Sequence, residues 1–517
     1  MSPELQPLDE YNLKLQANVH PVDWVNPKPA GIYDLVVLGG GTAGLVVAAG
    51  AAGLGLGLKV ALVEKNLLGG DCLNVGCVPS KCLIRSSRVV AEIREAAALG
   101  IHAPDLEIDF AAVMTRMRRI RAGISHHDSA ERFRNLGVDV FLGTAKFLDG
   151  QNSRTVQVEG QNLKFKKAVI ATGARATRPQ IPGLEAAGYL TNETVFSLSD
   201  RSYGCRNRPH RLAVIGGGPI GCELAQTFHR LGSAVTLFHK HSHVLDREDP
   251  EAAAVIQQEF IREGLGLILG CDLERVEKTA SGKTIYYRQD GMAKTIEVDE
   301  ILVGAGRSPN LEGLNLEAIG VQFNQQGVVV NDYLQTTNPL IYAAGDICMN
   351  WKFTHAADAA ARIVIKNTLF SPFGLGRSKL SSLVMPWVTY TDPEIAHVGL
   401  YEEEAIAQGL TVNTITIPFS SVDRAITDGE TKGFIKVLHP KGSDQILGAT
   451  IVARHAGDMI SEITLAIVTK QGLNALSGVI HPYPTQAEAI KKAADAYRKT
   501  LLTPRTQALL KLLTKFS

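Results

Sequence analysis

Cysteine is scarce in this sequence, and neither sign of charge dominates. Seven cysteines in 517 residues do not make the dense disulfide framework of a small secreted domain, so a reducing compartment is expected. With 53 Lys and Arg against 52 Asp and Glu, no strong field favours nucleic acid or an acidic membrane surface. The opening MSPELQPLDEYNLKLQ lacks the basic and apolar regions of a secretory signal. We therefore expect a cytoplasmic protein.

Long uncharged stretches are also rare. Only residues 35–58 are uncharged over a length that could cross a bilayer, and the many glycines there favour a strand, a turn and a helix instead. No membrane span is therefore expected. A chain of 517 residues is too long for one core and predicts about two to four domains.

Two segments share one plan, in which an apolar strand is followed by a glycine turn, a helix and a second apolar strand. They are residues 33–65 and 211–240. Each is typical of the opening βαβ unit of a dinucleotide-binding fold, where continuous apolar strands form a parallel sheet covered on both faces. The sequence therefore predicts two nucleotide sites.

The first glycine turn has the spacing GxGxxG, with Gly39, Gly41 and Gly44. Without side chains, the backbone here can approach a pyrophosphate at the helix N-terminus. Glu64 ends the second strand and can accept hydrogen bonds from an adenosine ribose. Turn, helix and terminal acid together predict a nucleotide site.

The second turn repeats this spacing with Gly216, Gly218 and Gly221. Its second strand ends in basic residues, His239, Lys240 and His241, and not in an acid. A carboxylate there would repel a 2′-phosphate, whereas Lys240 with His241 or His243 could neutralise one. NADPH is therefore favoured over NADH. The alternative is that these residues are solvated surface charges.

Cys72 and Cys77 are separated by four residues in GGDCLNVGCVPSK, a glycine-rich entry to a helix. The positive end of a helix dipole lowers the pKa of a thiol, which prepares it for disulfide exchange. Two alternatives are packing cysteines and a zinc site. No second CxxC or CxxH lies nearby to complete four zinc ligands, and no metal site is predicted.

Four motifs together resemble the pyridine nucleotide-disulfide oxidoreductases, which include glutathione reductase, dihydrolipoamide dehydrogenase and mercuric reductase. They are GGDCLNVGCVPSK, the ATG of residues 171–173, VGAGRSPN and AAGDI, and the resemblance runs from about Tyr33 to Thr503. It implies an α/β fold with two Rossmann-like dinucleotide-binding domains plus a C-terminal α+β dimerisation domain. The expected divisions are an N-terminal extension at 1–30, an FAD-binding domain at 31–185 and 310–375, an NAD(P)H-binding domain at 186–309, a dimerisation domain at 376–505 and a tail at 506–517.

The resemblance also implies roles for individual residues. Cys77 would lie against the flavin of FAD, and Cys72 would attack the acceptor. Lys81 would approach the flavin and pair with Glu223. Further residues implied at the cofactors are Asp346 at the ribityl chain, Arg307 by the nicotinamide cofactor, and Gly70, Ala145, Thr172, Gly173 and Gly306.

The segment HPYPTQAE departs from the disulfide-reducing members of this family. Tyr483 stands where those enzymes place a catalytic His, while Glu488 matches. An unperturbed Tyr, with a pKa of about 10, is no base at neutral pH. His481 is the alternative base, and alternation along an extended segment predicts that both side chains share one face.

Mercuric reductases resemble the chain in having Tyr at that position, and a soft metal ion held by thiolates needs no base for a leaving thiol. Those enzymes also carry a C-terminal cysteine pair, whereas here no cysteine follows Cys348. We expect a homodimeric NADPH- and FAD-dependent reductase of a small acceptor, such as a low-molecular-weight disulfide. The alternatives are a mercury(II) reductase and a dihydrolipoamide-dehydrogenase-like subunit of a multienzyme complex.

Both ends of the chain carry separate expectations. The first thirty residues contain Pro21, Pro27 and Pro29 without sustained periodicity, which predicts an extension lying on the surface. The tail TPRTQALLKLLTKFS predicts an amphipathic helix that packs on its own protein, with a membrane or partner contact as the alternative.

Overall fold

The computed structural model describes residues 5–102, 106–150, 154–199 and 208–515. Their contacts divide the chain into two units. The first comprises Met1–Gly216, Thr227–Thr236 and Asp272–Leu383, and the second comprises Gly217–Gln226, Leu237–Cys271 and Val384–Ser517. The division passes through the second glycine turn, between Gly216 and Gly217.

A seven-stranded sheet forms the centre of the first unit, with strand order β3-β2-β1-β6-β5-β4 and with β18 added beside β6. The strands are β1 (Ile32–Leu38), β2 (Val60–Glu64), β3 (Val138–Leu142), β4 (Ala145–Phe147), β5 (Thr155–Val158), β6 (Gln161–Ile170) and β18 (Ile341–Ala343). β1 pairs in parallel with β2 and with β6. Every residue of β2 is buried, as expected for a parallel strand covered on both faces.

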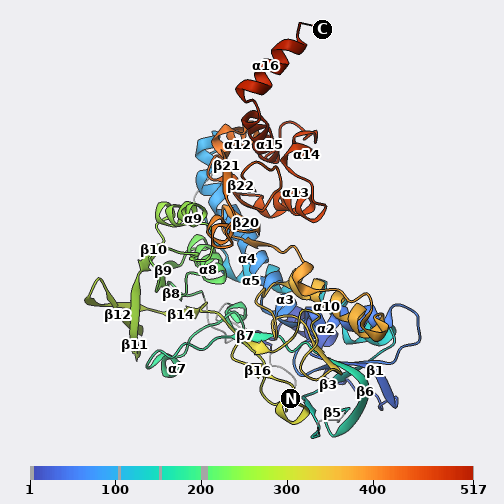
Figure 1. The fold of residues 1–517 in the computed structure, drawn as a ribbon. Helices are drawn as coiled ribbons and strands as arrows, with labels where there is room; N and C mark the ends of the chain where they lie inside the picture. The colour runs from blue at the N-terminus through green and yellow to red at the C-terminus, as the bar shows by residue number, and fades with distance from the viewer. Residues whose placement is uncertain (1–4, 103–105, 151–153, 200–207, 516–517) are drawn as a thin grey trace. The chain divides into compact units, whose positions relative to one another are not determined.

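Helix α2 (Thr42–Ala52) follows β1 and packs against α10 (Thr354–Leu369), as Figure 1 shows. The uncharged residues 35–58 thus form the predicted strand, turn and helix. Among the described residues, no helix has both the length and the apolar character needed to cross a membrane.

A helical stretch runs through the cysteine motif and beyond it. It contains α3 (Gly70–Asn74), α4 (Cys77–Glu95), α5 (Phe110–Ile124) and α6 (Ala130–Asn135). The other elements of this unit are β7 (Ala174–Ala176), α7 (Leu184–Ala187), β11 (Cys271–Thr279), β12 (Gly282–Gln289), β13 (Met292–Val298), β15 (Arg307–Pro309), β16 (Phe323–Asn324) and β17 (Gly327–Val328).

The N-terminal segment lies on the surface of the first unit and is docked there by a helix that its sequence did not predict. Helix α1 (Glu10–Val19) has Leu15 and Val19 fully buried. Beyond it, Asn26 exchanges two hydrogen bonds with the backbone of Leu142 in edge strand β3. Scattered prolines concealed this docking, because the helix buries only three residues and the rest of the segment binds through single side chains.

The second glycine segment contains β8 (Arg211–Ile215), α8 (Pro219–Arg230) and β9 (Ala234–His239). β8 pairs in parallel with β14 (Glu300–Val303). After β9 come α9 (Pro250–Glu263) and β10 (Gly266–Leu269). The sequence marks both ends of α9: the Asp249 side chain caps its first N–H groups, and Gly264 follows its end with φ +84°.

The second unit contains a five-stranded antiparallel sheet with order β19-β20-β23-β22-β21. The strands are β19 (Pro386–Thr389), β20 (Glu394–Gly399), β21 (Val412–Pro418), β22 (Phe434–Pro440) and β23 (Gly448–Ala453). Its helices are α11 (Glu402–Ala407), α12 (Asp423–Thr427), α13 (Ala456–Val468), α14 (Leu473–Ser477) and α15 (Glu488–Thr500). Ile435, Ile451 and Ile463 belong to its fully buried core. The predicted antiparallel α+β region is therefore confirmed.

The tail forms the predicted helix, α16 (Pro504–Leu513), but none of these ten residues is buried. Leu509 and Leu513 are each more than half exposed. The expected packing on its own chain is therefore wrong, because α16 continues beyond α15 without meeting the core (Figure 1). Phe516, part of the predicted apolar face, lies outside the described residues.

Candidate active site

The first glycine turn leaves no room for side chains on its inner face. A Cβ on Gly44 would lie 1.8 Å from the carbonyl oxygen of Gly39, and one on Gly39 would lie 2.3 Å from that of Ala171. Gly41 is the N-cap of α2 and provides no side-chain cap, so the first N–H groups of this helix are available to a pyrophosphate. The turn has the geometry predicted for a dinucleotide.

Glu64 lies at the end of β2, buried beside this turn. Its carboxylate accepts hydrogen bonds from the backbone N–H of Gly40 at 2.5 Å and of Asn66 at 2.6 Å. Burial raises the pKa of Glu64, while the two backbone hydrogen bonds oppose the rise. These bonds fix the carboxylate at the edge of the turn, where a ribose could reach it.

The cysteine motif begins directly on the glycine turn. A Cβ on Gly70 would lie 2.7 Å from the Cα atom of Gly41, and Gly70 has φ +57°, so this close approach requires glycine. Cys72 lies in the short helix α3, and Cys77 is the first residue of α4. The fold thus places both cysteines next to the predicted FAD site.

Both cysteines are free thiols in this structure, Cys72 partly buried and Cys77 exposed. The Sγ atom of Cys77 lies 3.3 Å from the hydroxyl of Thr354, which begins α10. Sequence reasoning missed Thr354, because 277 residues separate it from Cys77 and no motif marks it. Cys77 therefore lies at the N-terminal end of α10, the helix that packs against α2.

The surroundings of Cys72 make its thiol less acidic than that of an ordinary cysteine. A hydrogen bond with Cys77, burial and the charge of Cys77 together raise the pKa of Cys72 above its usual value. The expectation that the helix dipole lowers the pKa is therefore wrong for Cys72. It lies inside a helix of only five residues, while Cys77 occupies the N-terminus of the 19-residue α4.

Arg307 joins three parts of this site. Its guanidinium binds the carboxylate of Asp71 in α3, donates to the carbonyl oxygen of Ala174 at 2.7 Å and lies 3.2 Å from Asp346. Burial raises the pKa of Asp346, and the charge of Arg307 opposes that rise. Arg307 was expected beside the nicotinamide, and the structure connects it to the cysteine helix and to Asp346.

The described residues fit an FAD molecule. The glycine turn is a cradle that any Cβ would fill, and Glu64 stands beside it. The Nε atom of Arg307 is buried and forms an ion pair but no hydrogen bond within the described ranges. Nearby, the Thr172 hydroxyl donates to the carbonyl oxygen of Asn310, while Gly173 has φ +67°. The implied residue Ala145 begins β4, and Gly306 precedes β15.

The second glycine segment repeats the geometry of the first, but a histidine ring replaces the glutamate as the acceptor of the hydrogen bond from the turn. The backbone N–H of Gly217 donates to Nδ1 of His239 at 3.0 Å, as that of Gly40 donates to Glu64. A Cβ on Gly217 would lie 2.7 Å from the His239 ring, so only glycine allows this contact. The sequence places His239 at the strand end but does not show that its ring replaces the carboxylate.

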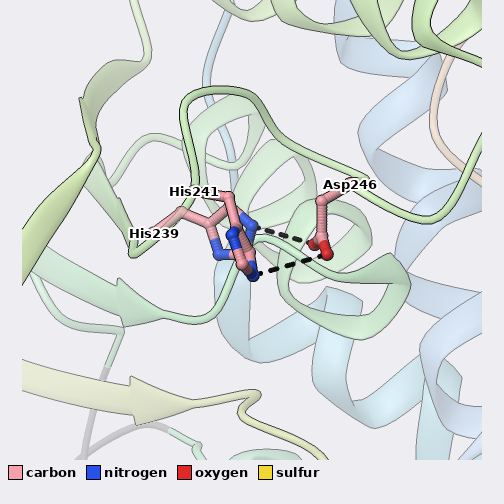
Figure 2. A group of neighbouring side chains, drawn as sticks. All are labelled: His239, His241 and Asp246. Atoms are coloured by element: carbon pink, nitrogen blue, oxygen red, sulfur yellow. Dashed lines mark hydrogen bonds and ion pairs between the residues drawn. The ribbon is translucent and has the colours of Figure 1, made fainter.

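His239 and His241 both direct a ring nitrogen at Asp246 (Figure 2). The distances from Nε2 to the carboxylate are 3.0 Å for His239 and 3.5 Å for His241. These three residues offer ligand atoms within 4.8 Å of one another, a spacing that could hold a metal ion. Asp246 is another residue that sequence reasoning missed, since it lies in a turn without a motif.

The hydrogen bond from Gly217 decides the state of the His239 ring. Because Nδ1 accepts a proton, neutral His239 carries its own proton on Nε2 and donates it to Asp246. A metal ion at Nε2 would require the opposite tautomer and the loss of the Gly217 bond. Burial also lowers the pKa of His239. The geometry therefore favours a neutral histidine over a metal ligand.

The residues predicted to meet a 2′-phosphate lie beside this ring. Lys240 is exposed, and the side chain of His241 is 46% exposed. Glu223, on α8, accepts a hydrogen bond from the backbone N–H of Tyr390 at 2.9 Å. Lys81 lies on α4, four residues after Cys77. Its pairing with Glu223 stays a prediction.

Tyr483 and His481 do not share one face, so that expectation was wrong. Tyr483 is 72% exposed, and its hydroxyl donates to Asp423 at 3.0 Å. The side chain of His481 is only 4% exposed and lies 3.0 Å from Glu462 in α13. Residues 481–483 form no strand, and the ion pair with Glu462 turns the His481 ring away. Glu488 begins α15 one turn further on.

The hydrogen bond with Asp423 and the charge of that carboxylate raise the pKa of Tyr483. The Tyr483 hydroxyl therefore stays protonated at neutral pH and cannot take a proton from a thiol. His481 is already engaged by Glu462. Neither residue offers a free general base in this structure of a single chain.

Comparisons with known proteins agree with this geometry. A family model described as pyridine nucleotide-disulphide oxidoreductase matches residues 33–361, and the model of the dimerisation domain of that family matches residues 385–494. A mercuric reductase from Lysinibacillus sphaericus is 36% identical over 470 residues, which cover 91% of this chain and 83% of that protein. A dihydrolipoyl dehydrogenase from Bacillus subtilis (strain 168) is 34% identical over 480 residues, 90% of this chain and 98% of that protein.

Solved structures show the same relationship. LpdA from Mycobacterium tuberculosis has a TM-score of 0.80 at 27% identity, covering 90% of this chain and 100% of that one. The HOCl-induced flavoprotein disulfide reductase RclA from Escherichia coli has a TM-score of 0.76 at 26% identity, covering 90% and 99%. The chain therefore belongs to the pyridine nucleotide-disulfide oxidoreductases, a family of FAD-dependent enzymes that use a pyridine nucleotide.

Proposed function

We propose that this enzyme uses NADPH to reduce a small acceptor through FAD and the Cys72–Cys77 disulfide. The observation that carries this proposal is the placement of the two cysteines. Cys77 lies at the N-terminus of α4 facing Thr354, and Cys72 lies beside it with a raised pKa. Bound FAD would accept a hydride from NADPH and make two electrons available to the disulfide.

Side chains of this protein would bind the two ends of FAD, and the two cysteines would carry the negative charge and the proton of the reduced pair on different residues. The glycine turn and Glu64 would bind the adenosine end of FAD, while Arg307 would hold Asp71 and Asp346 at its other end. When the Cys72–Cys77 bond takes up two electrons, Cys77 keeps the negative charge and Cys72 keeps a proton. With a disulfide acceptor, the Cys72 thiolate would break the acceptor S–S bond, form a mixed disulfide and release the first thiol, which takes up a proton. Cys77 would then attack the Sγ atom of Cys72, which re-forms the Cys72–Cys77 bond and releases the second thiol.

The proposal of NADPH rests on the neutral ring at the second glycine turn. In the first segment the turn N–H binds a carboxylate, which would repel a 2′-phosphate. In the second segment it binds neutral His239, with exposed Lys240 next in the chain. The carboxylate of Asp246 faces both histidines, and its charge is shared between the two rings.

The acceptor we propose is one whose reduction needs little help from a base. The protonated Tyr483 and the engaged His481 provide none within one chain. A thiolate-bound soft metal ion fits this requirement, and mercury(II) is the named candidate because of the 36% identical mercuric reductase. A small disulfide with an acidic leaving thiol fits as well. A lipoamide-linked subunit is less well supported, because dihydrolipoamide oxidation must remove a thiol proton.

We further propose that the enzyme is a homodimer formed through residues 385–494, which match the dimerisation domain. Tyr483 lies on the exposed surface of this region. A second copy could therefore bring its Tyr483 and Glu488 to the acceptor side of Cys72.

Anaerobic titration with NADPH tests the electron path. The reduced enzyme should show a thiolate–flavin charge-transfer band that Cys77→Ser abolishes. The matched variant Cys72→Ser should show such a band before NADPH is added and lose it on titration, because it leaves Cys77 as a thiolate beside oxidised FAD but has no disulfide to accept the electrons. A band in oxidised Cys77→Ser with none in oxidised Cys72→Ser would reverse the two roles. Turnover with mercuric ion, oxidised glutathione, lipoamide and quinones, measured with NADPH and then NADH, would identify the acceptor class.

A further inference from the structure

Helix α1 is attached to the rest of the first unit by buried polar contacts. Asp9, the N-cap of α1, lies 2.5 Å from Nε of Arg118 on α5, and the side chain of Arg118 is 1% exposed. Asn12 is likewise 1% exposed. Burying such groups is costly unless they are paired, so α1 is a built part of the domain.

Arg121, one turn after Arg118, connects α1 to the cysteine helix. One terminal nitrogen donates to Oδ1 of Asn12 at 2.7 Å, and the other donates to the carbonyl oxygen of Asn74 at 2.6 Å. Arg121 is 3% exposed. Burial lowers its pKa to about 10, which still leaves the guanidinium charged at neutral pH.

Asn74 is the last residue of α3, the helix that carries Cys72. Its side-chain amide donates to the carbonyl oxygens of Leu68 and Gly70, at 3.0 and 2.8 Å. Asn74 thus ties the end of α3 to its beginning, and Arg121 holds the carbonyl group at that end. A cation at the C-terminus of a helix also matches the negative end of its dipole.

The end of α1 contacts the same region from the other side. The backbone N–H of Leu68, two residues before α3, donates to the carbonyl oxygen of Val19 at 3.1 Å. The ring of His20 binds the carbonyl oxygen of Asn66. α3 is therefore held at both ends by residues that are themselves held by the N-terminal segment.

We propose that α1 is a positioning element for the cysteine pair. Asn12 orients Arg121, and Arg121 fixes the C-terminal end of α3, so that Cys72 is held in place relative to Cys77. None of these residues touches the acceptor, and Asn12 acts only through Arg121. The effect on turnover rests on the proposed redox role of Cys72, whereas the effect on the mobility of α3 does not.

Hydrogen exchange of the reduced holoenzyme tests the proposal directly. Loss of one hydrogen bond to a buried charged group should raise local opening of residues 68–76 by roughly tenfold. We expect this increase in Asn12→Ala. Asn12→Asp keeps the acceptor for Arg121 and should restore exchange close to that of the unmodified enzyme.

Lys14→Ala is the matched control. Lys14 lies on α1 two residues after Asn12, but its side chain is exposed. Its exchange at residues 68–76 should stay unchanged. Asn12→Ser, which keeps a shorter acceptor, replaces Asn12→Ala if the alanine variant does not fold.

A second readout uses the thiols themselves. In Asn12→Ala, the rate of Cys72 alkylation by iodoacetamide should rise by several-fold, and the charge-transfer absorbance should fall. Unchanged exchange and alkylation in Asn12→Ala, or an equal increase in Lys14→Ala, would overturn the proposal. If exchange rises while Cys72→Ser leaves turnover intact, α1 still positions α3 and the proposed electron path is the part that fails.

Discussion

The choice between NADPH and NADH is predicted to depend on the charge at position 239. His239 accepts the N–H of Gly217 as a neutral ring, in the place where Glu64 accepts that of Gly40. A glutamate at 239 should accept the same bond, because the first segment already shows this arrangement. Asp246 lies 3.0 Å from the ring, so a second carboxylate would meet it directly. The perturbation is therefore His239→Glu made together with Asp246→Asn.

The expected loss of binding free energy for NADPH follows from the repulsion between the new carboxylate and the 2′-phosphate. Two unit charges 4 Å apart interact by about 1 kcal/mol in water and about 4 kcal/mol at an effective dielectric constant of 20. A 2′-phosphate near a half-exposed strand end lies between these limits, so a penalty of about 2 kcal/mol is expected. That corresponds to roughly a 30-fold loss in the preference for NADPH over NADH. NADH has no 2′-phosphate and should be affected little.

The assay is kcat/KM for NADPH and for NADH, with Asp246→Asn alone as the reference. We expect the NADPH/NADH ratio to fall by about 30-fold from the reference to the double variant. FAD content should stay the same, because position 239 belongs to the second glycine segment. An unchanged ratio, in an enzyme that still accepts electrons from either nucleotide, would refute the reasoning about His239.

Three further predictions concern a general base at position 483, the contribution of the buried Lys283–Glu300 pair to stability, and the effect of His397 on the pH dependence of unfolding. Tyr483→His should raise turnover of a small disulfide by at least about tenfold, with activity rising through pH 6–7, while mercuric ion turnover stays the same. Lys283→Met should destabilise the first unit by about 3–5 kcal/mol in denaturant unfolding, because it strands Glu300 in a buried pair, and Lys283→Met with Glu300→Leu should recover most of this loss. Burial lowers the pKa of His397 from 6.5 to about 4, so folding favours its neutral form. About 3 kcal/mol of stability is present above pH 6.5 and is lost as the pH falls towards 4, and His397→Gln should lack this part of the pH slope in unfolding titrations.

Motifs that act through the backbone were predictable from the sequence. Gly39 and Gly44 must be glycine because of contacts made within one strand–turn–helix unit, and that constraint is visible in their spacing. The cysteine motif is equally local, since Gly70 packs on Gly41 and Cys77 begins the next helix. For such features, sequence neighbours determine the geometry.

Contacts between distant segments were not predictable. Thr354 meets Cys77 across 277 residues, and Arg121 meets Asn12 across 109. Each contact depends on tertiary packing that no local pattern encodes. The acidity of Cys72 was misjudged for the same reason, because burial and the second thiol outweigh the dipole of a five-residue helix.

The two glycine turns show how one backbone arrangement supports two different nucleotide sites. In both, a turn N–H points at the side chain that ends the second strand, so that side chain must be an acceptor. A carboxylate and a neutral imidazole can both accept this hydrogen bond, but they differ by one unit of charge. Because the N–H contact excludes a protonated ring at His239, the proposed acceptance of a 2′-phosphate at the second site would come from losing a negative charge and not from adding a positive one. Any positive charge must then come from neighbours such as Lys240, which are free to vary without disturbing the turn.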